Sequence, residues 1–138
     1  MRNGGIKLKD MKTNTTLQED LVTLALEGYK SILIYYAGSG DSGSIEEILL
    51  YKKEFDIDDF EFYSHNSEGL PLNNQIIKDN IEQFIMDNIL DNIEDWYNNE
   101  GGDGTVYIKI PSGEYHVDNQ VRLIDYINYK HEGNLFNL

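Results

Sequence analysis

The chain has 138 residues, 40% of them hydrophobic and 12% aromatic, which fits one domain with enough apolar material for a core. Lys and Arg number 11 against 25 Asp and Glu, and the formal net charge of −14 disfavours direct binding to nucleic acid or anionic membranes. The absence of cysteine excludes disulfides, thiolate metal sites and cysteine nucleophiles.

Residues 1–14 carry four basic side chains and two glycines without a helical or strand period. We predict a flexible N-terminal arm there, followed by a single domain over residues 15–138. The arm lacks the apolar block of a signal peptide, and no apolar run in the chain approaches the roughly 20 residues of a membrane span. We therefore expect a soluble protein in the cytoplasm.

The first half of the domain combines one helix with short strands. Thr16 and Glu19 have the spacing of a capping box, and leucines follow at helical intervals, so we predict a helix over residues 16–28. The β-branched and aromatic run Ser31–Tyr36 predicts a buried strand that ends in glycines. Residues 45–51 fit a second strand, paired antiparallel with the first, or a helical turn, and we favour the strand.

The second half begins with a third strand predicted at Phe60–Tyr63 and a loop over residues 66–71. Apolar residues then recur at intervals of three and four from Asn73 or Asn74 to Tyr97, which predicts a long amphipathic helix.

The C-terminal part is predicted to hold a hairpin of residues 105–110 and 114–117, which flank Pro111–Gly113. Residues 121–129 suit a strand or a short helix equally well. The order of elements predicts an α+β fold, an antiparallel β-sheet packed against one long and one short α-helix.

The outer face of the long helix is predicted to be strongly acidic, with Lys78 as its one basic residue. We predict a partner-binding surface made of its acidic residues and the single tryptophan at its end: Asp79, Glu82, Asp87, Asp91, Glu94, Asp95 and Trp96. A solvated face with no partner is the alternative for the acids, and a core position is the favoured alternative for Trp96.

Two Gly-rich segments carry a second candidate site, whose oxygen-bearing side chains are Asp41, Ser42, Glu46, Glu100 and Asp103. Such ligands suit Ca²⁺ or Mg²⁺, but their spacing matches no EF-hand, and ordinary turn chemistry is the favoured reading. We expect no cofactor. The tetrapeptide Gly40–Gly43 resembles the nucleophile sequence of trypsin-like proteases, yet all three histidines follow Ser42 and the chain is too short for two barrels.

The two Gly-rich segments together resemble a family of uncharacterised bacterial and phage proteins. Tyr36–Glu46 contains the pattern Gly-x-Gly-Asp-Ser-Gly-x-Ile-Glu, and Asp95–Gly104 contains Trp-x-Asn-x-x-Gly-x-x-Gly. The resemblance implies a compact α+β domain with the two loops as its hallmark, and it implies no particular activity.

Charge, size and the lack of a recognisable catalytic set predict a non-enzymatic acidic interaction protein. Carboxylates along a helix can imitate a row of phosphates and occupy a basic groove, such as that of a nuclease or another nucleic-acid-binding complex. A phage-encoded inhibitor of a host defence system, of the anti-CRISPR kind, would fit. The alternatives are a small-ligand- or metal-binding protein or enzyme that uses the two loops, and a structural virion component.

Overall fold

The computed structural model describes residues 16–54, 69–97, 100–122 and 126–138. The strands are β1 (Ser31–Ser39), β2 (Ser42–Tyr51), β3 (Leu70–Pro71), β4 (Gly102–Lys109), β5 (Glu114–Arg122) and β6 (Tyr126–Asn134). The helical elements are a helix over residues 16–26, α3 (Gln75–Asn88) and the 3-10 turns η2 (Leu90–Asn92) and η3 (Leu135–Asn137).

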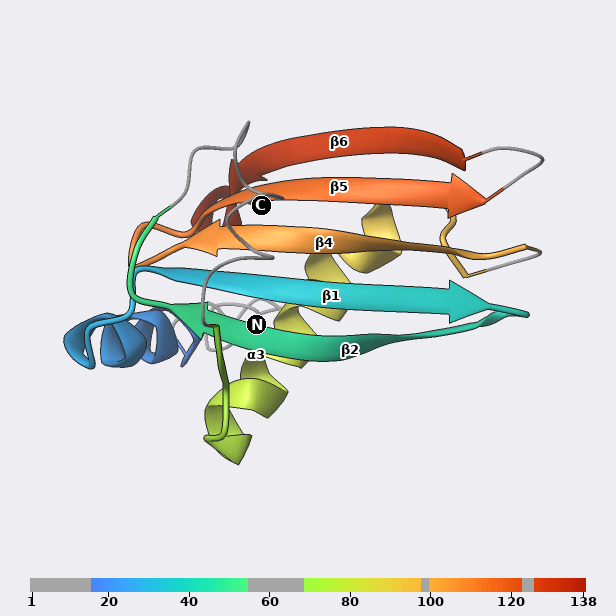
Figure 1. Ribbon diagram of the computed structural model, residues 1–138. Helices are drawn as coiled ribbons and strands as arrows, with labels where there is room; N and C mark the ends of the chain where they lie inside the picture. The colour runs from blue at the N-terminus through green and yellow to red at the C-terminus, as the bar shows by residue number, and fades with distance from the viewer. Residues whose placement is uncertain (1–15, 55–68, 98–99, 123–125) are drawn as a thin grey trace, which may run out of the picture.

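In this part of the chain, six strands form one antiparallel sheet in the order β3-β2-β1-β4-β5-β6, and the helix at 16–26 and α3 pack against it (Figure 1). The predicted α+β fold with one short and one long helix is therefore confirmed. The predicted N-terminal arm and the strand predicted at Phe60–Tyr63 lie outside the described residues.

The β1–β2 hairpin is longer than the sequence pattern predicts. Ser39 pairs with Ser42, so the turn contains only Gly40 and Asp41, whose φ angles are 59° and 68°. Two positive φ angles are the mark of a type I′ turn, whose twist matches that of the flanking strands. The glycines that we predicted as the end of the first strand therefore belong to the hairpin, whose register shifts once, between Tyr35 and Tyr36.

α3 begins where the sequence predicts, because the Asn74 side chain accepts a hydrogen bond from the Ile77 N–H at 3.2 Å. The prediction that the helix continues to Tyr97 is wrong: it stops at Asn88, and the backbone is extended at Ile93. The side chain of Asn88 donates to the carbonyl of Phe84 at 3.0 Å, and that of Asn92 donates to the carbonyl of Asn88 at 3.1 Å. Such side-chain bonds to the backbone compete with a continuing helix.

The C-terminal strands confirm the predicted hairpin, which β4 and β5 form around residues 111–113. The element predicted over residues 121–129 is not one element, because it spans the end of β5 and the start of β6. Its apolar residues Val121 and Ile127 lie opposite each other in neighbouring strands. A two-residue strand, β3, also occurs where we predicted only a loop.

β1 is buried on both faces, which explains the dense apolar run in its sequence. Ile32 and Ile34 join the main core with the helix side chains Leu21, Ile81 and Ile85. On the opposite face of the sheet, a smaller cluster consists of Leu33, Tyr51 and Tyr107. A central strand of this kind reads as continuous hydrophobic sequence because both faces need apolar side chains.

The two Gly-rich segments meet around Trp96. The side chain of Trp96 is 1% exposed, and its Nε1 donates a hydrogen bond to the carbonyl of Leu90 at 3.0 Å. The indole packs edge-on against the ring of Tyr36, with 4.9 Å between the ring centroids. Gly43 lies so close that a Cβ there would come within 2.3 Å of Cζ3 of Trp96. The turn is tied to the same segment, because the Asp41 N–H donates to the carbonyl of Tyr97 at 2.8 Å.

We expect Gly43→Ala to lower the free energy of unfolding by about 1–3 kcal/mol, because the added methyl group displaces a buried ring. Urea denaturation measures the change. Ser44→Ala, at the next and exposed position of β2, serves as the matched control and should change stability by less than about 0.5 kcal/mol. Equal stability of the Gly43→Ala protein would show that the Trp96 ring does not rest on Gly43.

Candidate functional site

The outer side of α3 and η2 carries an acidic row, which we define as Asp79, Glu82, Asp87 and Asp91. Asp79 and Asp87 are exposed, and each accepts a hydrogen bond at 2.7 Å from a glutamine one turn earlier in the helix. The opposite side of α3 is buried in the core through Ile77, Ile81, Phe84 and Ile85. The row is thus held on a helix that cannot rotate without exposing its apolar face.

The short helix adds acidic groups beside α3. Asn80 donates to Asp20 at 3.0 Å, which joins the two helices at their polar border. Burial raises the pKa of Asp20, the hydrogen bond from Asn80 opposes this effect, and the neighbouring Glu19 adds to it, so that the pKa lies above its ordinary value.

The remaining residues of the predicted partner surface lie elsewhere, because the helix ends before them. Trp96 is buried in the core, where it is unavailable to a partner. Asp95 is exposed and its Oδ1 accepts from the N–H of Tyr97 at 3.3 Å. Glu94 is turned toward β6, where its Oε1 lies 2.6 Å from Nε2 of His131. The structure therefore groups four of the six predicted acids and separates Glu94, Asp95 and Trp96 from them.

A chain of polar contacts connects Glu94 to the centre of the sheet. Asn119 on β5 is fully buried, and it accepts from the hydroxyl of Tyr36 at 2.7 Å. Its amide donates to the carbonyl of Glu94 at 3.0 Å and to the Glu94 carboxylate at 3.4 Å, and that carboxylate contacts His131. We call these four residues the polar network.

Both acidic groups of the polar network have shifted pKa values. Burial raises the pKa of the Tyr36 hydroxyl, and the nearby carboxylates of Asp118, Asp103 and Glu94 raise it further, so this group remains a proton donor. Burial alone would raise the pKa of Glu94, but hydrogen bonds from His131, its own backbone and Asn119, together with the His131 charge, lower it below the ordinary value.

The polar network was not predicted from the sequence. Its members come from β1, β5, β6 and the segment after η2, and no local pattern joins them. His131 also lines a cleft of about 370 Å³ between the end of α3 and β5–β6, together with Asn88, Asn92 and Tyr115. The network ties the segment after the helix to the sheet, and it places one imidazole at the wall of an open cleft.

The structure brings the two Gly-rich loops together, because Gly38 pairs with Gly102. A shallow hollow of about 400 Å³ lies between them, with Ser42, Glu46 and Arg122 among its lining residues. Of the predicted loop residues, Ser42 and Glu46 line this hollow. Asp41 lies in the β1–β2 turn, and Asp103 pairs with Ala37 of β1. The backbone carbonyl of Glu100 accepts a hydrogen bond from Arg122. Within the described ranges, no three His, Asp or Glu side chains gather in a way that could hold a metal ion.

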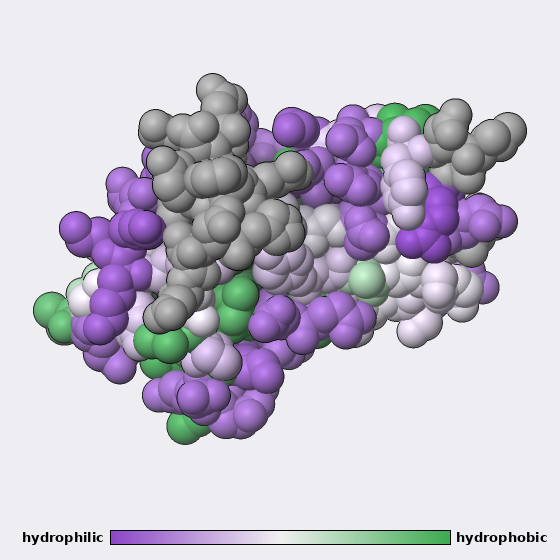
Figure 2. All heavy atoms as spheres, viewed as in Figure 1, coloured by the Kyte–Doolittle hydropathy of each residue, from purple (hydrophilic) through white to green (hydrophobic). Residues whose placement is uncertain are grey.

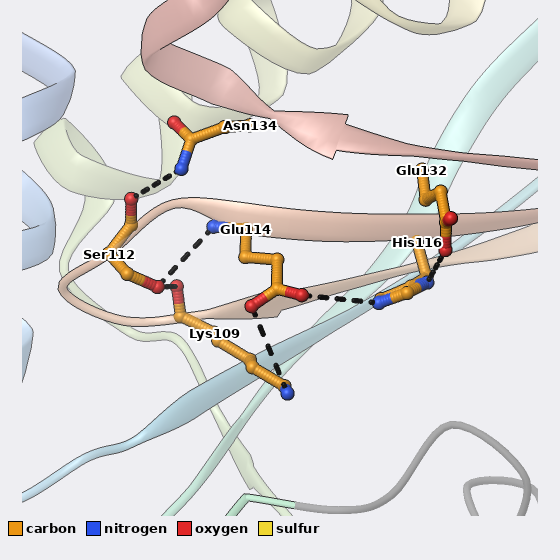
Figure 3. Close-up of polar contacts among 6 residues, drawn as sticks. All are labelled: Lys109, Ser112, Glu114, His116, Glu132 and Asn134. Carbon is orange, nitrogen blue, oxygen red and sulfur yellow. Dashed lines mark hydrogen bonds and ion pairs between the residues drawn. The ribbon is translucent and has the colours of Figure 1, made fainter.

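The sheet face away from α3 is turned toward the viewer in Figure 2, and hydrophilic residues gather there over β5 and β6. The imidazole of His116 lies between two carboxylates, with Nδ1 3.1 Å from Glu132 and Nε2 3.8 Å from Glu114 (Figure 3). Lys109 approaches the other oxygen of Glu114 at 3.9 Å. These contacts cross β4, β5 and β6, and their partial exposure limits the stability that each contributes.

The described residues form an α+β protein with one antiparallel sheet, helices packed against it and an acidic row on the outer side of α3 and η2. The chain belongs to DUF6878, a family of unknown function, which matches it over residues 13–133. Comparison with curated proteins and with solved structures finds no match. In the part of the chain that the structure describes, no helix is long and apolar enough to cross a membrane.

We expect Asn119→Ala to lower the free energy of unfolding by about 1–3 kcal/mol, since the buried Tyr36 hydroxyl and the Glu94 carbonyl each lose a hydrogen-bond partner. Gln120→Ala, one position along β5, is the control and should be close to neutral. Chemical denaturation of the three proteins compares them. If Asn119→Ala matches the unsubstituted protein, the polar network does not contribute to stability.

The lowered pKa of Glu94 predicts a pH dependence with a definite sign. Its ionised form stabilises the fold above the pKa of an unfolded glutamate, about 4.3, and this contribution is lost as the pH falls through the lower folded value. The melting temperature of the unsubstituted protein should therefore exceed that of Glu94→Gln near pH 6, and the gap should close toward pH 3. Glu46→Gln, at an exposed position, provides the baseline. A gap that stays constant over this range would contradict the assignment.

Proposed function

We propose that this protein is a non-enzymatic acidic interaction protein that occupies a basic surface of a partner protein with the acidic row of α3 and η2. The observation that carries the proposal is the arrangement of that row. Its acids project from one side of a helix whose other side is buried in the core. A surface that is already rigid loses little conformational freedom on binding, which favours affinity.

The chemistry of the row suits a partner that normally binds phosphates. Lys78, the basic residue of α3, is half-buried and does not interrupt the exposed acids. Asp79 and Asp87 are eight residues apart, about 12 Å along a helix axis, so the row can meet several basic side chains of one groove. A formal net charge of −14 adds long-range attraction toward such a groove and speeds the encounter.

We extend the proposal to a class of target, a nucleic-acid-handling defence protein of a host cell, with this chain as a phage-encoded inhibitor. RNA-guided nucleases hold their nucleic acids in positively charged channels, which a row of carboxylates could block. The alternatives are a structural virion component and a ligand- or metal-dependent protein. The second would use the hollow between the loops, but the described acids there do not gather into a metal-binding group.

The test is competition with target DNA for a guide-loaded, Cas9-type nuclease. The unsubstituted protein should displace the DNA, and its affinity should fall as salt rises, because the contact is between charges. Reversal of Asp79, Asp87 and Asp91 to Lys should weaken binding by at least about tenfold.

The matched control reverses Glu46, Glu47 and Glu54, which are exposed and lie outside α3 and η2. Each reversal replaces a negative charge with a positive one, so three reversals change the formal net charge from −14 to −8 in both triple variants. Retained binding by the control with lost binding by the α3 variant supports the acidic row as the contact. Equal losses of affinity in the two triple variants would show that overall charge, and not the acidic row, is responsible for binding. If the unsubstituted protein does not displace the DNA, this class of target is rejected.

A further inference from the structure

The two edges of the sheet differ sharply. At one edge lies β3, a two-residue strand that includes Pro71. Short edge strands and proline are common devices that prevent pairing with another chain. At the other edge lies β6, which has nine residues and no proline, and within the described ranges no strand pairs with its outer side. Its outward N–H and C=O groups form a template for a further strand.

The charged side chains of β6 indicate the kind of strand that would pair with this edge. Lys130 and Glu132 are two residues apart, so both project from the same face of the sheet, the face away from α3. Lys130 lies 4.0 Å from Asp118, and its side chain is 76% exposed. Glu132 contacts the imidazole of His116, as Figure 3 shows, and its side chain is 75% exposed. Both charges therefore remain accessible to a neighbouring strand.

β6 is complementary to itself in one register. When two copies pair antiparallel about a two-fold axis through His131, Lys130 of each copy lies opposite Glu132 of the other. An axis through Lys130 would oppose two lysines, and an axis through Glu132 would oppose two glutamates. Directly opposite charges of unlike sign stabilise a strand pair, and like charges destabilise it.

The same register also determines which other side chains lie opposite each other, with the two His131 imidazoles at the axis. It pairs residues 128–134 of the two copies and places Tyr129 opposite Gly133. Both residues lie on the helix side of β6, because their partners in β5 are Asn119 and Tyr115. Within one copy the ring of Tyr115 already lies over Gly133, because a Cβ there would come within 3.1 Å of that ring, so the two charges and not this pair decide the register.

We propose that two copies of this chain associate through β6, antiparallel and with the two-fold axis at His131, into one continuous sheet. The axis is perpendicular to the sheet, so the helices of both copies lie on the same face. The two acidic rows would then face the same way. The association does not depend on the proposed function, because it involves no residue of the acidic row.

Sedimentation of the full chain at physiological salt tests the proposal through charge reversal. The unsubstituted protein should show a concentration-dependent dimer. Lys130→Glu and Glu132→Lys should each weaken it by at least about tenfold, since each places like charges opposite one another at two positions. The double variant, with both reversals, should restore the dimer.

Two features separate this result from general charge effects and from misfolding. Glu132→Lys reduces the net negative charge, which by itself would favour association of two copies, so a weaker dimer would not be an effect of overall charge. Lys52→Glu, at an exposed position away from β6, is the control for Lys130→Glu and should leave the dimer intact. Thermal melts confirm that each variant folds.

A cross-link provides the second measurement. The chain contains no cysteine, so the thiol of His131→Cys can form a disulfide only with the same position of another copy. Rapid formation of a covalent dimer on oxidation supports the axis at His131, because directly opposite side chains lie close enough to join. A monomer at all sub-millimolar concentrations would overturn the proposal, as would a dimer that both single reversals leave unchanged.

Discussion

The buried side chain of Trp96 connects the helical layer of the structure to the sheet. The indole donates to the carbonyl of Leu90 at the end of the helical segment, meets the ring of Tyr36 on β1 and rests on Gly43 of β2. A ring of this size dominates the local burial energy, and its one polar group must find a partner in the core. The helix therefore has to end early enough for the chain to turn back and deliver the ring to the sheet.

The polar network follows from the position of Trp96. Once the indole is in place, the carbonyl and carboxylate of Glu94 lie beside the sheet, and Asn119 and His131 provide the partners that these groups require. Asn119 also satisfies the buried Tyr36 hydroxyl. Because an unpaired buried polar group is costly, the three strands and the segment after η2 are held in one arrangement.

This rigid interior leaves two external features with distinct chemistry. The acidic row lies on the helical layer, where α3 is anchored by its apolar side. The open edge of β6 lies at the end of the sheet, where backbone groups and two opposite charges are presented. Neither feature is required by the core. The acidic row is the basis of the proposed binding to a basic surface, and the edge is the basis of the proposed self-association.

Local periodicity in the sequence was sufficient to predict several elements of the fold. The apolar run Ser31–Tyr36, the helix start at Asn73 or Asn74, the helical spacing of the isoleucines and the turn at residues 111–113 each encode a neighbourhood of a few residues. The exposed acids of α3 followed from the same spacing. These features could be predicted because the physical interactions that produce them act within one element.

The end of α3 and the contacts between distant groups depend on packing across the fold and could not be predicted from local patterns. The spacing of Ile89, Ile93 and Trp96 continues the helical period, yet all three are buried or half-buried after the helix has ended. The pairing of Gly38 with Gly102, and the contact of Glu94 with His131, join positions far apart in the chain. Periodicity records that a side chain is buried, but the partner that buries it is chosen by packing across the whole fold.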